Sequence, residues 1–126
     1  MAQLLLDTNV VVWLLLGDRD AVSDEAERAL TDERNSVSLS AVSVWEIAIK
    51  RSLGKLRIEP EWGRALTRLD FDPLPITSTH AQRVEHLPWH HRDPFDRLLV
   101  AQAAVEGHAL VSADPRLGDY DVDVLW

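Results

Sequence analysis

The sequence contains no cysteine among its 126 residues. This absence excludes disulfide bridges, thiol nucleophiles and thiolate zinc sites, so a bound metal must take oxygen or imidazole ligands. Positive charge is also scarce, because 13 Lys and Arg residues stand against 21 Asp and Glu residues. The formal net charge of −8 repels polyanions at long range. A nucleic-acid partner would therefore have to be held by local basic groups or by bound cations.

Long apolar runs are missing as well. The N-terminal segment has no positive charge over Met1-Ala2-Gln3, and Asp7-Thr8-Asn9 interrupts the apolar stretch, so we expect neither a signal peptide nor a membrane span. The composition, 46% hydrophobic and 27% charged, is typical of a globular domain. We expect a single domain over residues 1–126, located in the cytoplasm.

Strand and helix patterns alternate along the chain. Short apolar runs predict strands at 3–6, 37–39, 74–76, 109–112 and 122–126. Longer periodic segments predict helices at 10–16, 24–31, 41–53, 61–69, 79–86 and 96–106. Within the third helix, the apolar stripe of Ala41, Val44, Trp45 and Ala48 is expected to face the core. The alternation predicts an α/β domain with a mainly parallel central sheet.

Two carboxylates stand at the mouth of the apolar helix that ends before Gly107. Asp93 has the position of an N-cap, Pro94 suits the first helical position, and Asp96 falls in the first turn. An acid-x-x-acid pattern of this kind is usually a structural cap. A chemical role therefore depends on whether other acids converge on the same place.

Three further acids are expected near that helix mouth. Asp7 directly follows the first strand, Asp114 follows the strand at 109–112, and Glu46 lies in the helix after the second strand. Each has a local explanation as a cap or turn residue, Glu46 by forming a capping box with Ser43. Ligands of parallel α/β sheets bind at the carboxyl ends of the strands, where these side chains should meet. Like charges at short range destabilise one another unless a cation such as Mg²⁺ or Mn²⁺ neutralises them.

Four ordered motifs resemble those of PIN-domain ribonucleases and, more narrowly, the VapC toxins of bacterial type II toxin–antitoxin systems. They are Leu5-Leu6-Asp7-Thr8-Asn9, Ser40-x-x-Ser43-x-Trp45-Glu46-Ile47-Ala48, His91-x-Asp93-Pro94-Phe95-Asp96-Arg97-x-Leu99-x-Ala101-Gln102-Ala103 and Val111-Ser112-Ala113-Asp114. The resemblance implies a three-layer α/β/α fold, Mg²⁺-dependent endonucleolytic cleavage of RNA by a metal-activated water, a cognate VapB-type antitoxin and a homodimer.

The resemblance also implies roles for individual residues. The catalytic acids would be Asp7, Glu46, Asp96 and Asp114. Asp7 and Asp96 would be the metal ligands, with Glu46, Asp114 and Asp93 as further candidates, and Mn²⁺ could replace Mg²⁺. The polar support positions would be Thr8, Asn9 and Ser112. For Asp93 we favour capping over metal contact.

Several other residues admit two interpretations. Lys50, Arg51, Lys55 and Arg57 form a basic patch that could contact RNA or simply complement a helix end. His90 and His91 could bind phosphate or metal, but we favour a structural hydrogen-bonding role. We expect Arg97 to pair with Asp96, its neighbour in the sequence.

Other functions are compatible with an acid at the end of the first strand. A haloacid-dehalogenase-like phosphatase needs a second acid two residues later, where this chain has Asn9. A receiver-type phosphoacceptor has no use for the Asp93 to Asp96 signature. The non-enzymatic alternative is a binding module whose acids hold Mg²⁺ for stability.

Overall fold

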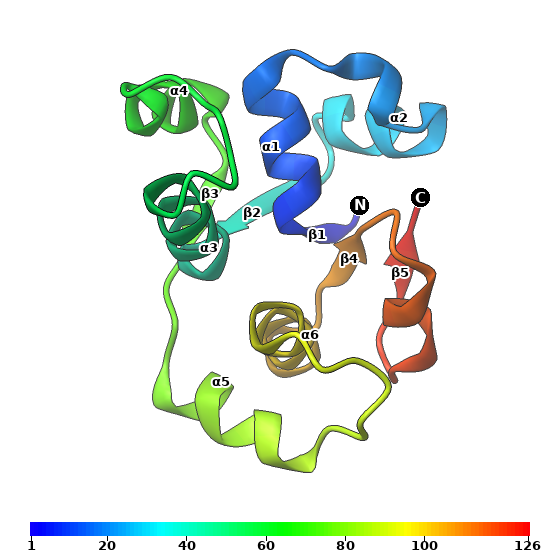
Figure 1. Ribbon diagram of the computed structural model, residues 1–126. Helices are drawn as coiled ribbons and strands as arrows, with labels where there is room; N and C mark the ends of the chain where they lie inside the picture. Colours follow the sequence, from blue (N-terminus) through cyan, green and yellow to red (C-terminus); the bar gives the residue numbers. More distant parts are fainter.

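Five parallel strands form the centre of the computed structural model, which describes residues 1–126 (Figure 1). The strands are β1 (Gln3–Leu6), β2 (Ser36–Ser40), β3 (Asp72–Leu74), β4 (Ala109–Val111) and β5 (Val124–Leu125). Their order across the sheet is β3-β2-β1-β4-β5. Because every pairing is parallel, each strand is reached by a crossover, and the carboxyl ends of all strands lie at one edge.

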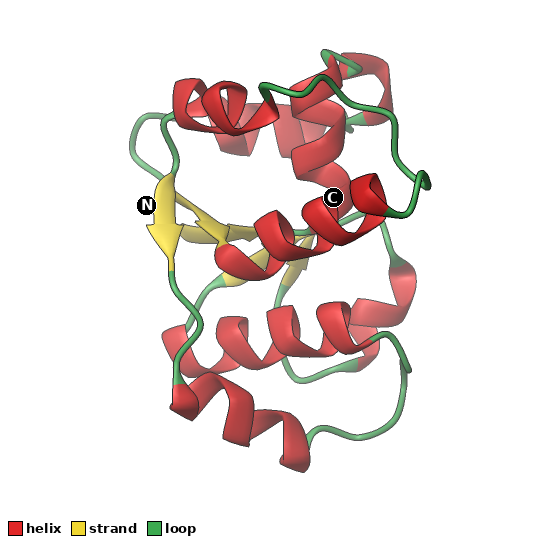
Figure 2. Cartoon of the chain, turned by 60° about the vertical axis from the view of Figure 1, so that its left-hand side comes forward, coloured by secondary structure: helices red, strands yellow, loops and turns green.

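Helices cover both faces of this sheet (Figure 2). They are α1 (Thr8–Leu16), α2 (Asp24–Thr31), α3 (Ala41–Ser52), α4 (Trp62–Leu69), α5 (Ser78–Arg83) and α6 (Pro94–Glu106), with short 3₁₀ turns η1 (Arg19–Ala21), η2 (Val84–His86) and η3 (Pro115–Asp119). None of them has the length and apolar character needed to cross a bilayer.

Alternate residues of β1 divide the core into two clusters. Leu4 and Leu6 pack with residues of α1 and α2, whereas Leu5 packs with residues of α6 on the opposite face. This alternation follows from the two-residue period of a strand, and it explains why the whole of Leu4 to Leu6 is apolar. The fold is the parallel α/β domain that the sequence pattern predicts, in the three-layer α/β/α arrangement that the family resemblance implies.

Most helix starts follow the expected caps. Ser23 and Ser40 accept hydrogen bonds from the amides of Ala26 and Val42, so α2 and α3 begin where predicted. Helix α1 begins at Thr8, two residues earlier than expected, with Asp7 at the N-cap position. The predicted helix 79–86 divides into α5 and the 3₁₀ turn η2.

The third strand is displaced from its expected place. It covers Asp72 to Leu74 instead of 74–76, and it lies at an edge of the sheet, the place expected from Pro75, although the proline within the strand is Pro73. Pro73 is tolerated there because an edge strand has one side without a hydrogen-bonding neighbour.

The buried face of α3 is not the predicted one. Trp45 is 51% exposed, and Ala41 and Ala48 are exposed as well, so most of the predicted stripe faces outward, while Val44 is half-buried against the core. The buried set is Val42, Ser43, Glu46 and Ile47. Both sets have helical spacing but lie on opposite faces of the helix, about 180° apart at 100° per residue, and the observed orientation turns Glu46 inward. Hydrophobicity alone therefore chooses the wrong face.

Candidate active site

The acidic residues gather at the carboxyl ends of the two central strands. Asp7 follows β1 directly, Asp114 follows β4, and the two strands pair side by side with Leu6 opposite Val111. The chain runs outward from this pair in both directions, through β2 and β3 on one side and β5 on the other. Such a switch in strand order opens a crevice in which α/β proteins bind ligands.

Asp7 is buried in this crevice, with 4% of its surface exposed. It occupies the N-cap position of α1 but makes no side-chain capping bond. Its Oδ2 instead accepts a 2.6 Å hydrogen bond from the Ser112 hydroxyl. Burial raises the pKa of Asp7, and the charges of Glu46 and Asp114 raise it further, while the Ser112 hydrogen bond opposes the change. The predicted capping explanation for Asp7 is thus wrong.

The other two predicted support residues differ in placement. The Thr8 hydroxyl lies 2.9 Å from the Ser43 hydroxyl, a buried contact that ties the start of α1 to α3. Ser43 therefore does not form the expected capping box with Glu46, because Ser40 is the actual cap of α3. Asn9 is exposed and contributes no hydrogen bond to the cluster.

The two acids at the start of α6 have different surroundings. Asp93 is the N-cap, and its Oδ1 accepts hydrogen bonds of 2.8 and 3.1 Å from the amides of Phe95 and Asp96. The Asp96 carboxylate is turned to the acidic cluster. Burial raises the pKa of Asp96 to about 7, with further contributions from the charges of Asp7, Asp93, Glu46 and Asp114. These couplings show that the predicted acids converge.

Glu46 extends from α3 into the same cluster and is 4% exposed. Its Oε2 lies 2.6 Å from the Lys50 ammonium, one turn later on the helix. This contact raises the pKa of Lys50. The other carboxylate oxygen, Oε1, is buried without a hydrogen-bond partner. A buried charged oxygen in that state is costly, and it marks a place for a ligand.

Asp114 is held by the residues that follow it. The Arg116 side chain forms a fork on both Asp114 oxygens, with contacts of 3.1 Å from Nε and 3.0 Å from Nη2, and the Arg116 amide adds a third hydrogen bond. The Arg116 fork holds the pKa of Asp114 below its ordinary value. The pair is a charge-assisted bidentate contact at the rim of the cluster.

His91 lies within the site, although the sequence interpretation favoured a structural hydrogen-bonding role for it over metal or phosphate binding. Its Nε2 lies 3.0 Å from Asp96 Oδ2 and 3.3 Å from Asp114 Oδ2, so this ring joins two of the acids. The Asp93 amide donates to His91 Nδ1 over 3.0 Å, which fixes the ring. The sequence does indicate that this residue can reach the site, because it lies two residues before the N-cap of α6, from which a side chain can extend to the start of the helix. His90, in contrast, packs edge-on against Tyr120.

Arg97 does not pair with Asp96 as expected. Its side chain is buried and donates to the carbonyl oxygens of Val84, Leu87 and Pro88 and to the Tyr120 hydroxyl, at 2.8 to 3.3 Å. Its guanidinium also stacks on Trp89, 3.8 Å from the ring centroid. Adjacent residues of a helix point about 100° apart, so Arg97 turns away from the cluster and braces the segment that carries His91.

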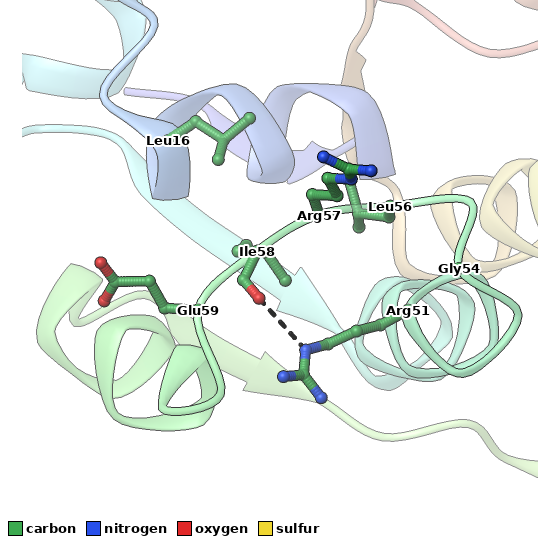
Figure 3. Close-up of a pocket in the computed structure, with 7 residues that line it drawn as sticks. All are labelled: Leu16, Arg51, Gly54, Leu56, Arg57, Ile58 and Glu59. Carbon is green, nitrogen blue, oxygen red and sulfur yellow. Dashed lines mark hydrogen bonds between the residues drawn. The ribbon is translucent and has the colours of Figure 1, made fainter.

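Some side chains of the predicted basic patch are engaged in contacts within the chain. Lys50 pairs with Glu46, and Arg51 donates from Nε to the Ile58 carbonyl over 3.2 Å (Figure 3). Arg51 and Arg57 line a hollow of about 720 Å³ together with Leu16, Gly54, Leu56, Ile58 and Glu59. The patch therefore borders this hollow.

The donor set of the cluster fits a hard divalent cation. The carboxylates of Asp7 and Asp96 carry raised pKa values because each is buried among other acids, and Glu46 offers an unpartnered oxygen. Carboxylate oxygens are the ligands that Mg²⁺ and Mn²⁺ prefer. A cation bound there would relieve the repulsion and the burial penalty together.

The fold and the site together define a class of α/β protein, one with a doubly wound parallel sheet and an acidic crevice at the switch point of that sheet. A profile of the PIN domain matches residues 4–123. No curated protein sequence matches the chain significantly. The chain belongs to the PIN domain family.

Solved structures of low sequence identity share the fold. One is VapBC2 from Rickettsia felis bound to a DNA fragment from their promoter, at 14% identity and a TM-score of 0.67, with 97% of this chain and 96% of that chain covered. Another is VapBC-1 from nontypeable Haemophilus influenzae, at 17% identity and a TM-score of 0.67, with the same coverage. DNA-bound VapBC from Salmonella typhimurium matches at 15% identity and a TM-score of 0.65, covering 98% and 97% of the two chains.

Proposed function

We propose that this PIN-domain protein is the toxin of a toxin–antitoxin pair and acts as a divalent-metal-dependent endoribonuclease. The observation that carries the proposal is the convergence of Asp7, which is buried, and Asp96, which is partly buried, in the crevice at the switch point of the sheet, where both carboxyls have raised pKa values. The likeness of the fold to several VapBC structures supports the assignment to a toxin.

In this account Asp7 and Asp96 are the principal ligands of Mg²⁺ or Mn²⁺, with Glu46 and Asp114 completing the catalytic quartet. When bound, the cation supplies Lewis-acid activation of water and neutralises charge on the phosphodiester. Ser112 orients Asp7 through its 2.6 Å hydrogen bond, and Thr8 fixes the start of α1 against α3. Asp93 acts by holding the amide of Asp96, which sets the direction of the first turn of α6. Direct hydrolysis of this kind leaves a 5′-phosphate and a 3′-hydroxyl.

The RNA backbone would approach over the free part of the basic patch. Lys55 is exposed, and Arg51 and Arg57 border the hollow beside it. Lys50, the third cation of the predicted contact set, is engaged with Glu46. Contacts from such side chains to phosphates give affinity without sequence preference, and they offset locally the net charge of −8.

A VapB-type antitoxin is the partner that the VapBC likeness supports. We also propose that the chain forms a homodimer through the outward stripe of α3. Trp45, 51% exposed, packs edge-on against Phe95 with ring centroids 4.9 Å apart, and Ala41 and Ala48 extend this apolar surface. An exposed aromatic flanked by small residues is well suited to burial between two copies.

Expression in a bacterial host tests the proposed activity. Induction of the wild-type chain should arrest growth and create new RNA 5′-phosphate ends, and Asp7→Asn should do neither while accumulating as folded protein. Coexpression of the cognate antitoxin should prevent the arrest. Arrest without new RNA ends, or equal cleavage by the Asp7→Asn variant, would reject the ribonuclease.

A further inference from the structure

We infer that Lys50 and Arg116 are the counter-ions of Glu46 and Asp114 within the acidic cluster, so that the site takes one divalent cation through Asp7 and Asp96 and has no need of a second. The inference rests on the metal site of the proposed function and concerns the number of ions that this site holds.

Lys50 neutralises Glu46. The ammonium lies 2.6 Å from Glu46 Oε2, and the two side chains are one helical turn apart on α3, so the pair forms without ordering a separate segment. Glu46 Oε1 still offers an oxygen, but the negative charge of the side chain is already matched.

Arg116 neutralises Asp114 in the same way. Its fork and its amide account for three hydrogen bonds to the Asp114 carboxylate, and His91 Nε2 adds a fourth. Both oxygens of Asp114 are thus engaged. A second cation at this carboxylate would have to displace Arg116 and would gain little, since the charge it neutralises is already paired.

Asp7 and Asp96 have no such partner. The side-chain donor to Asp7 is the uncharged hydroxyl of Ser112. Asp96 is approached by His91 Nε2 at 3.0 Å. Neither of these two carboxylates contacts a Lys or Arg side chain, whereas Glu46 and Asp114 each do. Asp93, the fifth acid of the cluster, is held as the N-cap of α6 by the amides of Phe95 and Asp96. The two remaining carboxylates, Asp7 and Asp96, correspond to the charge of one divalent ion.

The chain contains a matched control for the Arg116 fork. Arg34 binds Asp32 with the same two-residue spacing and the same three donors, its amide, Nε and Nη2. The pKa of Asp32 owes its fall to Arg34, and neither residue is coupled to the acids of the cluster. Loss of the Arg34 fork should therefore leave metal binding unchanged.

Manganese binding measures the stoichiometry without any RNA. Mn²⁺ is titrated into metal-free full-length protein, and free Mn²⁺ is followed by electron paramagnetic resonance. The wild-type chain should bind one ion, and Asp7→Asn or Asp96→Asn should weaken binding at least tenfold. Deleting a whole ion pair, as in Glu46→Gln with Lys50→Met or Asp114→Asn with Arg116→Met, should keep one ion with its affinity changed by no more than about threefold. Arg34→Gln should match wild type.

Removing only the counter-ions gives the opposite result. Lys50→Met with Arg116→Met leaves Asp7, Glu46, Asp96 and Asp114 without a basic partner and should admit a second Mn²⁺, whereas Lys50→Arg with Arg116→Lys should retain a single ion. Circular dichroism with and without Mn²⁺ verifies folding, and the charge-neutral pair deletions remain informative if the double cation variant does not fold.

Three results would overturn the inference: two ions of similar affinity in wild type, a tenfold loss in either pair deletion, or a single ion in the folded double cation variant. Absence of any Mn²⁺ binding would reject the metal site itself and the inference with it. One bound ion together with inactive RNA assays would contradict the proposed function alone.

Discussion

The hydroxyl of Ser112 donates a 2.6 Å hydrogen bond to Oδ2 of Asp7, joining the ends of β4 and β1 at the centre of the site. The same hydroxyl oxygen accepts from the Asp114 amide over 3.1 Å, so one side chain fixes two acids. Residues 105 positions apart in sequence are thereby placed within one cluster.

Loss of this hydroxyl should weaken metal binding. Ser112→Ala removes the hydrogen bond that opposes the rise in the Asp7 pKa, so the carboxylate becomes harder to ionise. Substitutions next to a ligand typically cost about tenfold or more in metal affinity. Ser112→Thr retains the hydroxyl and should restore the wild-type value. Isothermal titration with Mn²⁺ compares the three proteins, and equal affinity of Ser112→Ala and wild type would show that Asp7 is positioned by other contacts.

The stability of the metal-free protein should fall as the pH rises from about 4 through about 7. Asp96 has a pKa of about 7 in the folded chain, and the pKa of Asp7 is also raised, so the folded state binds more protons than the unfolded state in this range. Stability then decreases with pH. The lowered pKa of Asp114 acts in the opposite sense, but chiefly at lower pH.

Urea unfolding in EDTA at about pH 5 and about pH 8 measures this dependence. Asp96→Asn should flatten it, and saturating Mg²⁺ should restore stability at the higher pH. A metal-free protein that is as stable at the higher pH as at the lower would contradict the assigned environment of Asp96.

Arg97 should be important for stability although it lies outside the acidic cluster. Arg97→Met leaves the carbonyls of Val84, Leu87 and Pro88 without their donor, a loss of about 2–4 kcal/mol in the free energy of unfolding. Arg97→Lys should recover little of the lost stability, because lysine lacks the planar guanidinium that donates to several acceptors at once. The exposed neighbour Arg92, changed to Met, should alter stability by less than about 0.5 kcal/mol. Equal urea midpoints for the two Met variants would refute this role.

Trp45 should control assembly. Trp45→Glu places a charge in the proposed interface and should convert a homodimer into a folded monomer, as measured by light scattering after size exclusion. Leu16 is a matched control, because it is 52% exposed on α1 compared with 51% for Trp45 on α3. Leu16→Glu should leave the dimer intact. A dimer that persists in Trp45→Glu would place the interface elsewhere. A monomeric wild-type protein would exclude the homodimer.

The fold and the location of the acids could be predicted from the sequence because both depend on local signals. Strands that precede Asp7 and Asp114, and a helix capped by Asp93, specify a parallel sheet and its crevice. The rotation of α3 was not predictable in this way, since Trp45 is the more hydrophobic choice and Glu46 is buried by its pairing with Lys50. The contacts of His91 and Arg97 depend on tertiary placement of the segment before α6, which no periodicity encodes.

The most direct test of the account is cleavage of an end-labelled structured RNA by the purified chain free of antitoxin. The account predicts endonucleolytic products with 5′-phosphate and 3′-hydroxyl ends in Mg²⁺ or Mn²⁺, no cleavage in EDTA, and a loss of at least about a hundredfold in Asp96→Asn. Cleavage that persists in EDTA or in Asp96→Asn, or products that end in a 2′,3′-cyclic phosphate, would contradict it.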